Sequence, residues 1–174
     1  ASTTAGATTT AGTAATADVA ILRTASSIEE LAVAAYQTAI DSGLVTTMAI
    51  ADAAKLFQSQ HKEHSGLFQS LTTKAGGEAY TMPNAVILEA IQPTIDALQD
   101  EMGVVALALE LENVAAQTYQ SNVATFMDPS LNAAIMSVGG VEARHAAALA
   151  GVLEQAQVPA AFQVVDKAVK AARK

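Results

Sequence analysis

Residues 135–152 read IMSVGGVEARHAAALAGV. The side chains at alternating steps of three and four along this stretch predict one face of an α-helix. This series is Ile135, Val138, Glu142, His145, Leu149 and Val152. A glutamate and a histidine therefore occupy the middle of an apolar stripe that we expect to face the protein core.

Three more segments place ionisable residues in the middle of an apolar stripe. Their series are Leu22, Ala25, Glu29, Val33, Tyr36, Ile40; Phe57, His61, His64, Phe68, Leu71; and Val105, Leu109, Glu112, Ala116, Tyr119, Val123. A carboxylate buried without a partner is costly, so such residues are usually paired with other charges or bound to a metal. The sequence therefore predicts four helices that bring their ionisable side chains together.

The two halves of the chain repeat one spacing of glutamate and tyrosine. Tyr36 follows Glu29 by seven residues, and Tyr119 follows Glu112 by seven. Seven residues are almost two helical turns, so each pair shares a face of its helix.

Each half also carries a histidine with a polar partner three residues earlier. His64 follows His61 in the first half, and His145 follows Glu142 in the second. Residues at i and i+3 are neighbours on a helix surface, so each pair can reach one ion.

At these residues the chain resembles the ferritin-like superfamily, which includes ferritins, rubrerythrins and an exported, desiccation-related branch. The resemblance covers about residues 18–155 and rests on Glu29 with Tyr36, His61-Lys62-Glu63-His64, Glu112 with Tyr119, and Glu142-Ala143-Arg144-His145. That superfamily builds a di-iron or di-manganese centre from one Glu on each of two helices and a Glu-x-x-His on each of the other two. The resemblance implies an all-α four-helix bundle that holds two divalent ions. The implied metal ligands are Glu29, His61, His64, Glu112, Glu142 and His145.

His61 departs from this pattern, because the superfamily usually has a glutamate there. Glu63 does not replace it, since two residues turn the helix by about 200° and Glu63 then faces solvent. Three carboxylates and three imidazoles should hold an oxidised diferric pair less well than four carboxylates would. Imidazole also suits Zn, Cu and Ni. Iron or manganese is the first choice, with zinc or copper as the alternative.

Tyr36 and Tyr119 have two interpretations. They are candidate catalytic residues with a redox or proton-donor role. They can equally be core aromatics whose hydroxyls bond a nearby carboxylate. The sequence does not choose between these roles.

The punctuation of the chain predicts long helices over 18–43, 46–75, 94–126 and 129–155, with shorter ones over 84–91 and 160–173. Short links make the first two long helices, and the last two, antiparallel neighbours, while a link of about twenty residues crosses the bundle between the two hairpins. We therefore expect a flexible Ala/Thr-rich tail over 1–17, the bundle over 18–155, and an extension with a short helix over 156–174.

The composition excludes several functions. A net charge of −8 argues against nucleic acid, because phosphate binding needs clustered Lys and Arg. No run of about 18 apolar residues predicts a membrane span. The absence of cysteine excludes disulfides, thiol catalysis and iron–sulfur ligation.

Two further predictions concern the location of the protein and its oligomeric state. The start at Ala1, followed by small residues, is typical of a chain whose secretory signal has been removed, so we expect an extracytoplasmic protein. Alanine-rich helix faces favour a homodimer or a larger homo-oligomer.

The leading functional hypothesis is a di-metal oxidoreductase that reacts with dioxygen or peroxide, of the ferroxidase or peroxide-scavenging type. One alternative is an exported metal-binding or protective protein without turnover. Another is a structural or assembly protein that uses the bundle as a scaffold. Fold alone does not decide among these, because function depends on the site.

Overall fold

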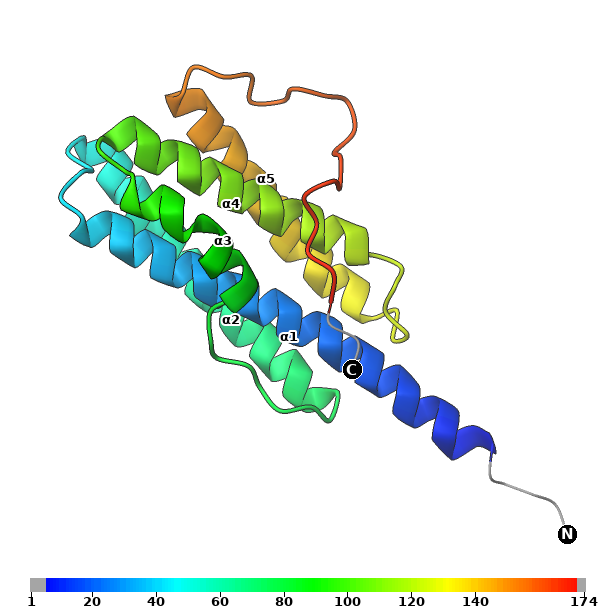
Figure 1. Cartoon of the computed structure of the whole chain (residues 1–174). Coiled ribbons are helices and arrows are strands. Elements are labelled where there is room, and N and C mark those ends of the chain that lie inside the picture. The colour runs from blue at the N-terminus through cyan, green and yellow to red at the C-terminus, as the bar shows by residue number, and fades with distance from the viewer. Residues whose placement is uncertain (1–5, 172–174) are drawn as a thin grey trace, which may run out of the picture.

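A computed structural model describes the backbone of residues 6–171 and the side chains from residue 16 onward. It contains the helices α1 (Gly6–Asp41), α2 (Met48–Lys74), α3 (Ala85–Asp96), α4 (Glu101–Asn122) and α5 (Leu131–Val152), and no strand within that range. Helices α1 and α2 form one hairpin, α4 and α5 form the other, and the connection that contains α3 crosses between them (Figure 1). The predicted all-α, ferritin-like arrangement of two hairpins and one long crossover is confirmed.

Two apolar clusters fill the bundle on either side of its midpoint. One cluster includes Phe68 and Tyr119, and the other includes Phe57 and Val105. Along each of the four long helices, the ionisable residues of the apolar stripe lie between the positions that contribute to the two clusters. Apolar packing at both ends therefore encloses a polar layer in the middle.

The first helix begins earlier than predicted. It starts at Gly6, so Asp18 is not an N-cap, and residues 6–17 continue the helix instead of forming a flexible tail. Alanine has the best helix propensity, and adding turns to an existing helix is much easier than starting one. Residues 1–5 of the predicted tail lie outside the described part of the chain.

Asp18 has a different structural role. Its buried carboxylate accepts hydrogen bonds from the backbone N–H groups of Met127, at 2.7 Å, and Asp128, at 2.9 Å. This contact ties α1 to the turn between α4 and α5.

The predicted helix over 94–126 is divided in two. The crossover helix α3 runs through Pro93 to Asp96, and α4 begins only at Glu101. The break has a local cause, because the side chain of Asp100 accepts a hydrogen bond from the N–H of Gly103 and caps α4. At its other end α3 is capped by Asn84, whose side chain accepts a hydrogen bond from the N–H of Ile87.

The predicted C-terminal helix over 160–173 is wrong for the described residues. After α5 the chain runs without a helix as far as residue 171 and returns along α4 (Figure 1). The N–H of Lys167 donates to Gln117 Oε1, and the N–H of Val169 donates to Thr118 Oγ1, both at 2.9 Å. These acceptors on α4 satisfy backbone N–H groups that a helix would have used itself.

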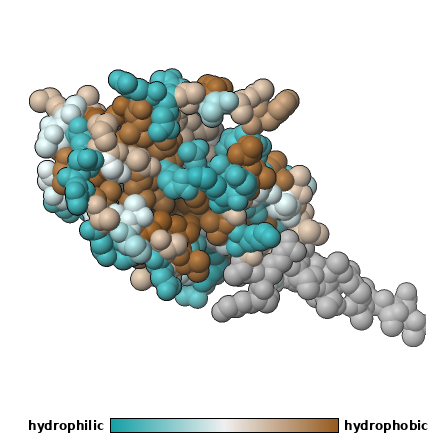
Figure 2. Space-filling view, turned by 45° about the horizontal axis from the view of Figure 1, so that its top comes forward, coloured by the Kyte–Doolittle hydropathy of each residue, from teal (hydrophilic) through white to brown (hydrophobic). Residues whose placement is uncertain are grey.

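The face of the protein seen in Figure 2 mixes hydrophilic and hydrophobic residues. Several exposed apolar side chains lie on the C-terminal segment, including Val158 and Phe162. Of the helices that the structure describes, none is both long enough and apolar enough to cross a bilayer.

Candidate metal centre

The six side chains predicted as metal ligands converge at the middle of the bundle. Helix α1 contributes one, α2 two, α4 one and α5 two: Glu29, His61, His64, Glu112, Glu142 and His145. All are at most 3% exposed except His64, whose side chain is 13% exposed. Glu63, in contrast, faces solvent as predicted.

The ligands form two overlapping groups. One group consists of Glu29, His61, His64 and Glu142, and the other of His61, Glu112, Glu142 and His145. Within each group the ligand atoms all lie within 4.8 Å of one another. Each group could therefore surround one ion, and His61 and Glu142 belong to both.

His61 lies between the two lone carboxylates. Its Nδ1 is 2.7 Å from Glu29 Oε2, and its Nε2 is 3.1 Å from Glu112 Oε1. Each imidazole nitrogen thus faces the lone glutamate of a different ligand group. A glutamate at this position would offer two oxygens from one carboxylate, whereas the imidazole separates its two donor atoms across a ring.

Glu142 is the least satisfied of the buried carboxylates. Neither of its oxygens has a hydrogen-bond partner among the described residues, and the same is true of His64 Nδ1. His64 Nδ1 lies 2.7 Å from Glu142 Oε1, so the two atoms are close without forming a hydrogen bond. Buried polar atoms without partners are rare in native proteins. Carboxylate oxygens and imidazole nitrogens that lie this close without hydrogen bonds are a ligand set that fits a divalent transition metal.

The pKa values of the three buried carboxyl groups depend on the charged residues beside them. Burial raises the pKa of Glu142, and the negative charge of Glu29 adds to the effect. Burial alone would also raise the pKa of Glu29 and Glu112, but contacts with histidines hold both below the usual 4.5. Glu29 and Glu112 therefore stay ionised at neutral pH, each beside a buried histidine.

The pKa values of the three histidines are all raised. Burial alone would lower the pKa of His64, but its contacts with Glu142 and Glu29 raise it to about 9. The pKa values of His61 and His145 are raised by the same kind of contact. Without a metal, protons on these rings neutralise the carboxylates, so a metal must displace protons to bind.

A sequence model described as a ferritin-like domain matches residues 17–155 of the chain. The chain belongs to this family. Comparison with curated proteins and with solved structures finds no significant match. The ferritin-like assignment covers α1 from residue 17, all of α2, α4 and α5, and all six converging side chains.

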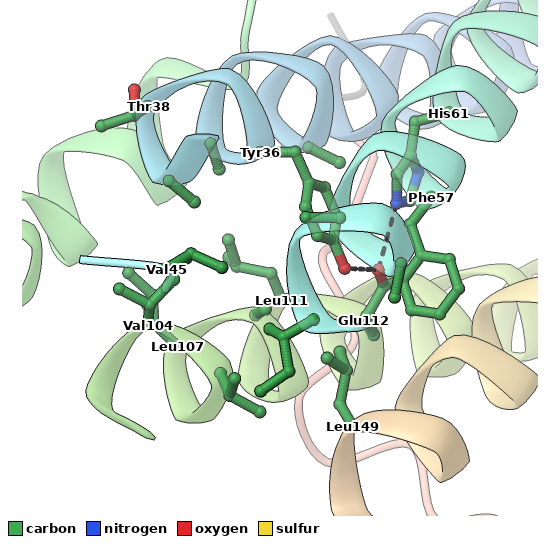
Figure 3. Close-up of a pocket in the computed structure, with 18 of the residues that line it drawn as sticks. Tyr36, Thr38, Val45, Phe57, His61, Val104, Leu107, Leu111, Glu112 and Leu149 are labelled. Atoms are coloured by element: carbon green, nitrogen blue, oxygen red, sulfur yellow. Dashed lines mark hydrogen bonds and ion pairs between the residues drawn. The ribbon is translucent and has the colours of Figure 1, made fainter. Parts of the chain in front are cut away.

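The two tyrosines of this ferritin-like bundle hydrogen-bond across it. Tyr36 on α1 donates to Glu112 on α4, and Tyr119 on α4 donates to Glu29 on α1. Figure 3 shows the Tyr36 hydroxyl and a His61 nitrogen meeting the same Glu112 oxygen. Burial raises the pKa of both tyrosines well above 10, and the facing carboxylates add to the shift. They are therefore protonated donors that hold the carboxylates in place.

Gln60 also contacts the candidate metal site, although the sequence did not predict it. Its Oε1 lies 2.6 Å from Nε2 of His145, while Nδ1 of His145 lies 3.3 Å from Glu142 Oε2. Such a contact places the imidazole proton on Nε2 and leaves Nδ1 free for a metal, a common arrangement around metal sites. Gln60 lies one residue before His61, off the apolar stripe, so helical periodicity gave no signal for it.

Proposed function

We propose that this protein binds two divalent transition-metal ions, iron or manganese first, and that the pair reacts with dioxygen or peroxide. The observation that supports this most is the overlap of two four-residue ligand groups that share His61 and Glu142. A single closed structural site would need only one such group. Two adjoining groups are what a di-metal centre requires.

Each residue of the centre has a part in the proposal. Glu29 and His64 would hold one ion, and Glu112 and His145 the other, with His61 and Glu142 placed between them. When bound, the reduced metals would supply the electrons that the oxidant accepts.

The surrounding residues would prepare the site for this chemistry. The Tyr36 and Tyr119 hydroxyls fix one oxygen of each lone carboxylate, which leaves the second oxygen oriented toward the histidines. The apolar clusters on both sides keep water away from the polar layer. We propose a positioning role for both tyrosines, with a proton-donor role open to the same hydroxyls.

A second candidate function is metal binding without turnover, with zinc or copper as the ion. The observation that favours it is His61, whose neutral ring stands where the superfamily pattern has a carboxylate. Three glutamates neutralise only three of the four charges on two divalent ions, and imidazole suits zinc and copper.

Elemental analysis of the purified protein, followed by addition of ferrous ion under oxygen or peroxide, separates the two candidates. The redox proposal predicts about two iron or manganese ions per chain and a transient visible absorption band on oxidation. It also predicts that Glu142→Gln loses the bound metal and the absorption band. The matched control Glu63→Gln, on the solvent face, should keep the metal and the band. Bound zinc or copper without consumption of the oxidant would instead establish the second candidate. Metal-free protein that binds none of these four metals would contradict both candidate functions.

A further inference from the structure

An apolar cavity reaches the polar layer from one end of the bundle. Its volume is about 370 Å³, and its walls come from α1, α2, the crossover with α3, α4 and α5. Its buried end extends past Tyr36, His61 and Glu112 to Ile28 and Ala115, while Thr38 and Ser42 line its exposed outer end. Figure 3 shows this arrangement, with Thr38 and Val45 on the side away from the hydrogen bonds of Glu112.

The walls between these two ends are apolar. They include Val104, Leu107, Ala108 and Leu111 on α4 together with Ile95 on the crossover. Water gains few hydrogen bonds in such a space, and an apolar cavity of this size left empty loses packing contacts on every side. The cavity is also within the size range of small-molecule binding sites. An apolar ligand would therefore be better accommodated than water.

The shape of the cavity favours one kind of ligand. Along α4 its lining runs from Val104 to Ala115, a length of about 17 Å at the helical rise. Along α1 the lining runs from Ile28 to Ser42, about 21 Å at the same rise. A cavity elongated along the bundle in this way suits one extended hydrocarbon chain better than a compact fused-ring molecule.

We propose that this cavity binds a single aliphatic chain whose polar head lies in solvent at the exposed end near Thr38 and Ser42 and whose apolar body extends inward past Tyr36 and Glu112. The crossover helix α3 covers the ligand, and none of its residues is buried, so it is the wall best able to move for entry. This site goes beyond the metal centre and does not depend on the metal.

Calorimetric titration of the purified full chain with 1-hexanol, 1-decanol and 1-hexadecanol tests the proposal. The metal content of the same samples is measured, so that a failure of metal binding is recognised separately. Affinity should rise about fourfold per methylene from hexanol to decanol and then stop rising once the chain exceeds the cavity. The compact 1-adamantanol, which has the same number of carbons as decanol, should bind much more weakly.

Matched substitutions locate the binding. Ala108→Phe puts a ring into the cavity from α4 and should weaken decanol binding at least about tenfold, whereas Ala106→Phe on the exposed face of the same helix should not. If Ala108→Phe does not fold, Ala35→Phe with its exposed control Ala34→Phe makes the same test from α1. Equal binding of decanol and adamantanol, no binding of any alcohol, or unchanged binding in the cavity-filling variant overturns the proposal.

Discussion

The Tyr36 hydroxyl on α1 donates a 2.5 Å hydrogen bond to Glu112 Oε1 on α4, although the two residues are 76 positions apart in the chain. The bond is buried and connects the two hairpins directly at the polar layer. It is one half of a crossed pair, because Tyr119 donates in the reverse direction to Glu29. The structure thus links each lone carboxylate to the opposite hairpin.

Removal of this hydroxyl by Tyr36→Phe should weaken both the fold and the metal site. A hydrogen bond to a charged group contributes about 1.5–3 kcal/mol, so the free energy of unfolding should fall by roughly that amount. Metal affinity should fall about 10- to 100-fold, as is usual when a residue that orients a ligand is lost. Urea unfolding and metal titration measure the two effects.

Tyr80→Phe is the control for this prediction, because Tyr80 lies in the link between α2 and α3 and contacts Arg23 with its ring. Tyr80→Phe removes one hydroxyl that contacts none of the six candidate ligands, so metal affinity should not change. If the two variants lose metal to the same extent, Tyr36 does not position Glu112.

Gln60→Ala should reduce metal affinity about 10- to 100-fold with little loss of stability. The change removes the acceptor at 2.6 Å from Nε2 of His145, so the ring proton is no longer held there. Titration of the metal-free protein with manganese measures the loss, and Ser59→Ala, on the exposed side of the same helix, serves as its control. Equal affinities in the two variants would show that the ring of His145 is oriented without Gln60.

Asp18→Ala should lower the free energy of unfolding by about 2–3 kcal/mol. The buried carboxylate accepts two backbone hydrogen bonds, and its loss leaves the N–H groups of Met127 and Asp128 without their acceptor. Asp52→Ala removes an exposed carboxylate from α2 and should change stability by less than about 0.5 kcal/mol. Urea unfolding curves of equal midpoint for the two variants would contradict the structural role of Asp18.

The metal-free protein should lose stability as pH rises through about 9, the pKa of His64. Because this folded pKa lies above the usual 6.5, the contacts of protonated His64 with Glu142 and Glu29 stabilise the fold fully below pH 6.5 and are lost above the folded value. Since His64 is partly open to solvent, we expect a contribution of about 1–2 kcal/mol.

Urea unfolding of the metal-free protein at about pH 6 and about pH 10 measures this contribution, with His64→Gln as the comparison. The variant should show a smaller loss between the two pH values, because His61 and His145 alone then titrate. The prediction fails if the wild type and His64→Gln lose the same amount.

Helical periodicity was sufficient to predict which residues meet in the core. Glu29, Glu112 and the two histidine motifs fall on apolar stripes, and burial of those stripes brings them together whatever the details of the loops. The polar layer could therefore be predicted from spacing within each helix, and the two-hairpin arrangement from the lengths of the links between helices.

Features that depend on contacts between distant segments could not be predicted in this way. The crossed tyrosine bonds join α1 to α4, and Gln60 reaches His145 from another helix, so no spacing within one helix reveals them. The C-terminal segment has helix-forming residues, but its backbone N–H groups bond side chains of α4 instead. These tertiary contacts outweigh the local helix propensity. Export and self-association remain predictions from the sequence.

The proposed pairing of two ions around His61 and Glu142 can be seen by anomalous X-ray scattering from crystals of the metal-loaded protein. We predict two peaks inside the bundle, one beside Glu29 and His64 and one beside Glu112 and His145, with His61 and Glu142 between them. The absence of any peak among these residues, or peaks only at carboxylates on the protein surface, would contradict a di-metal centre.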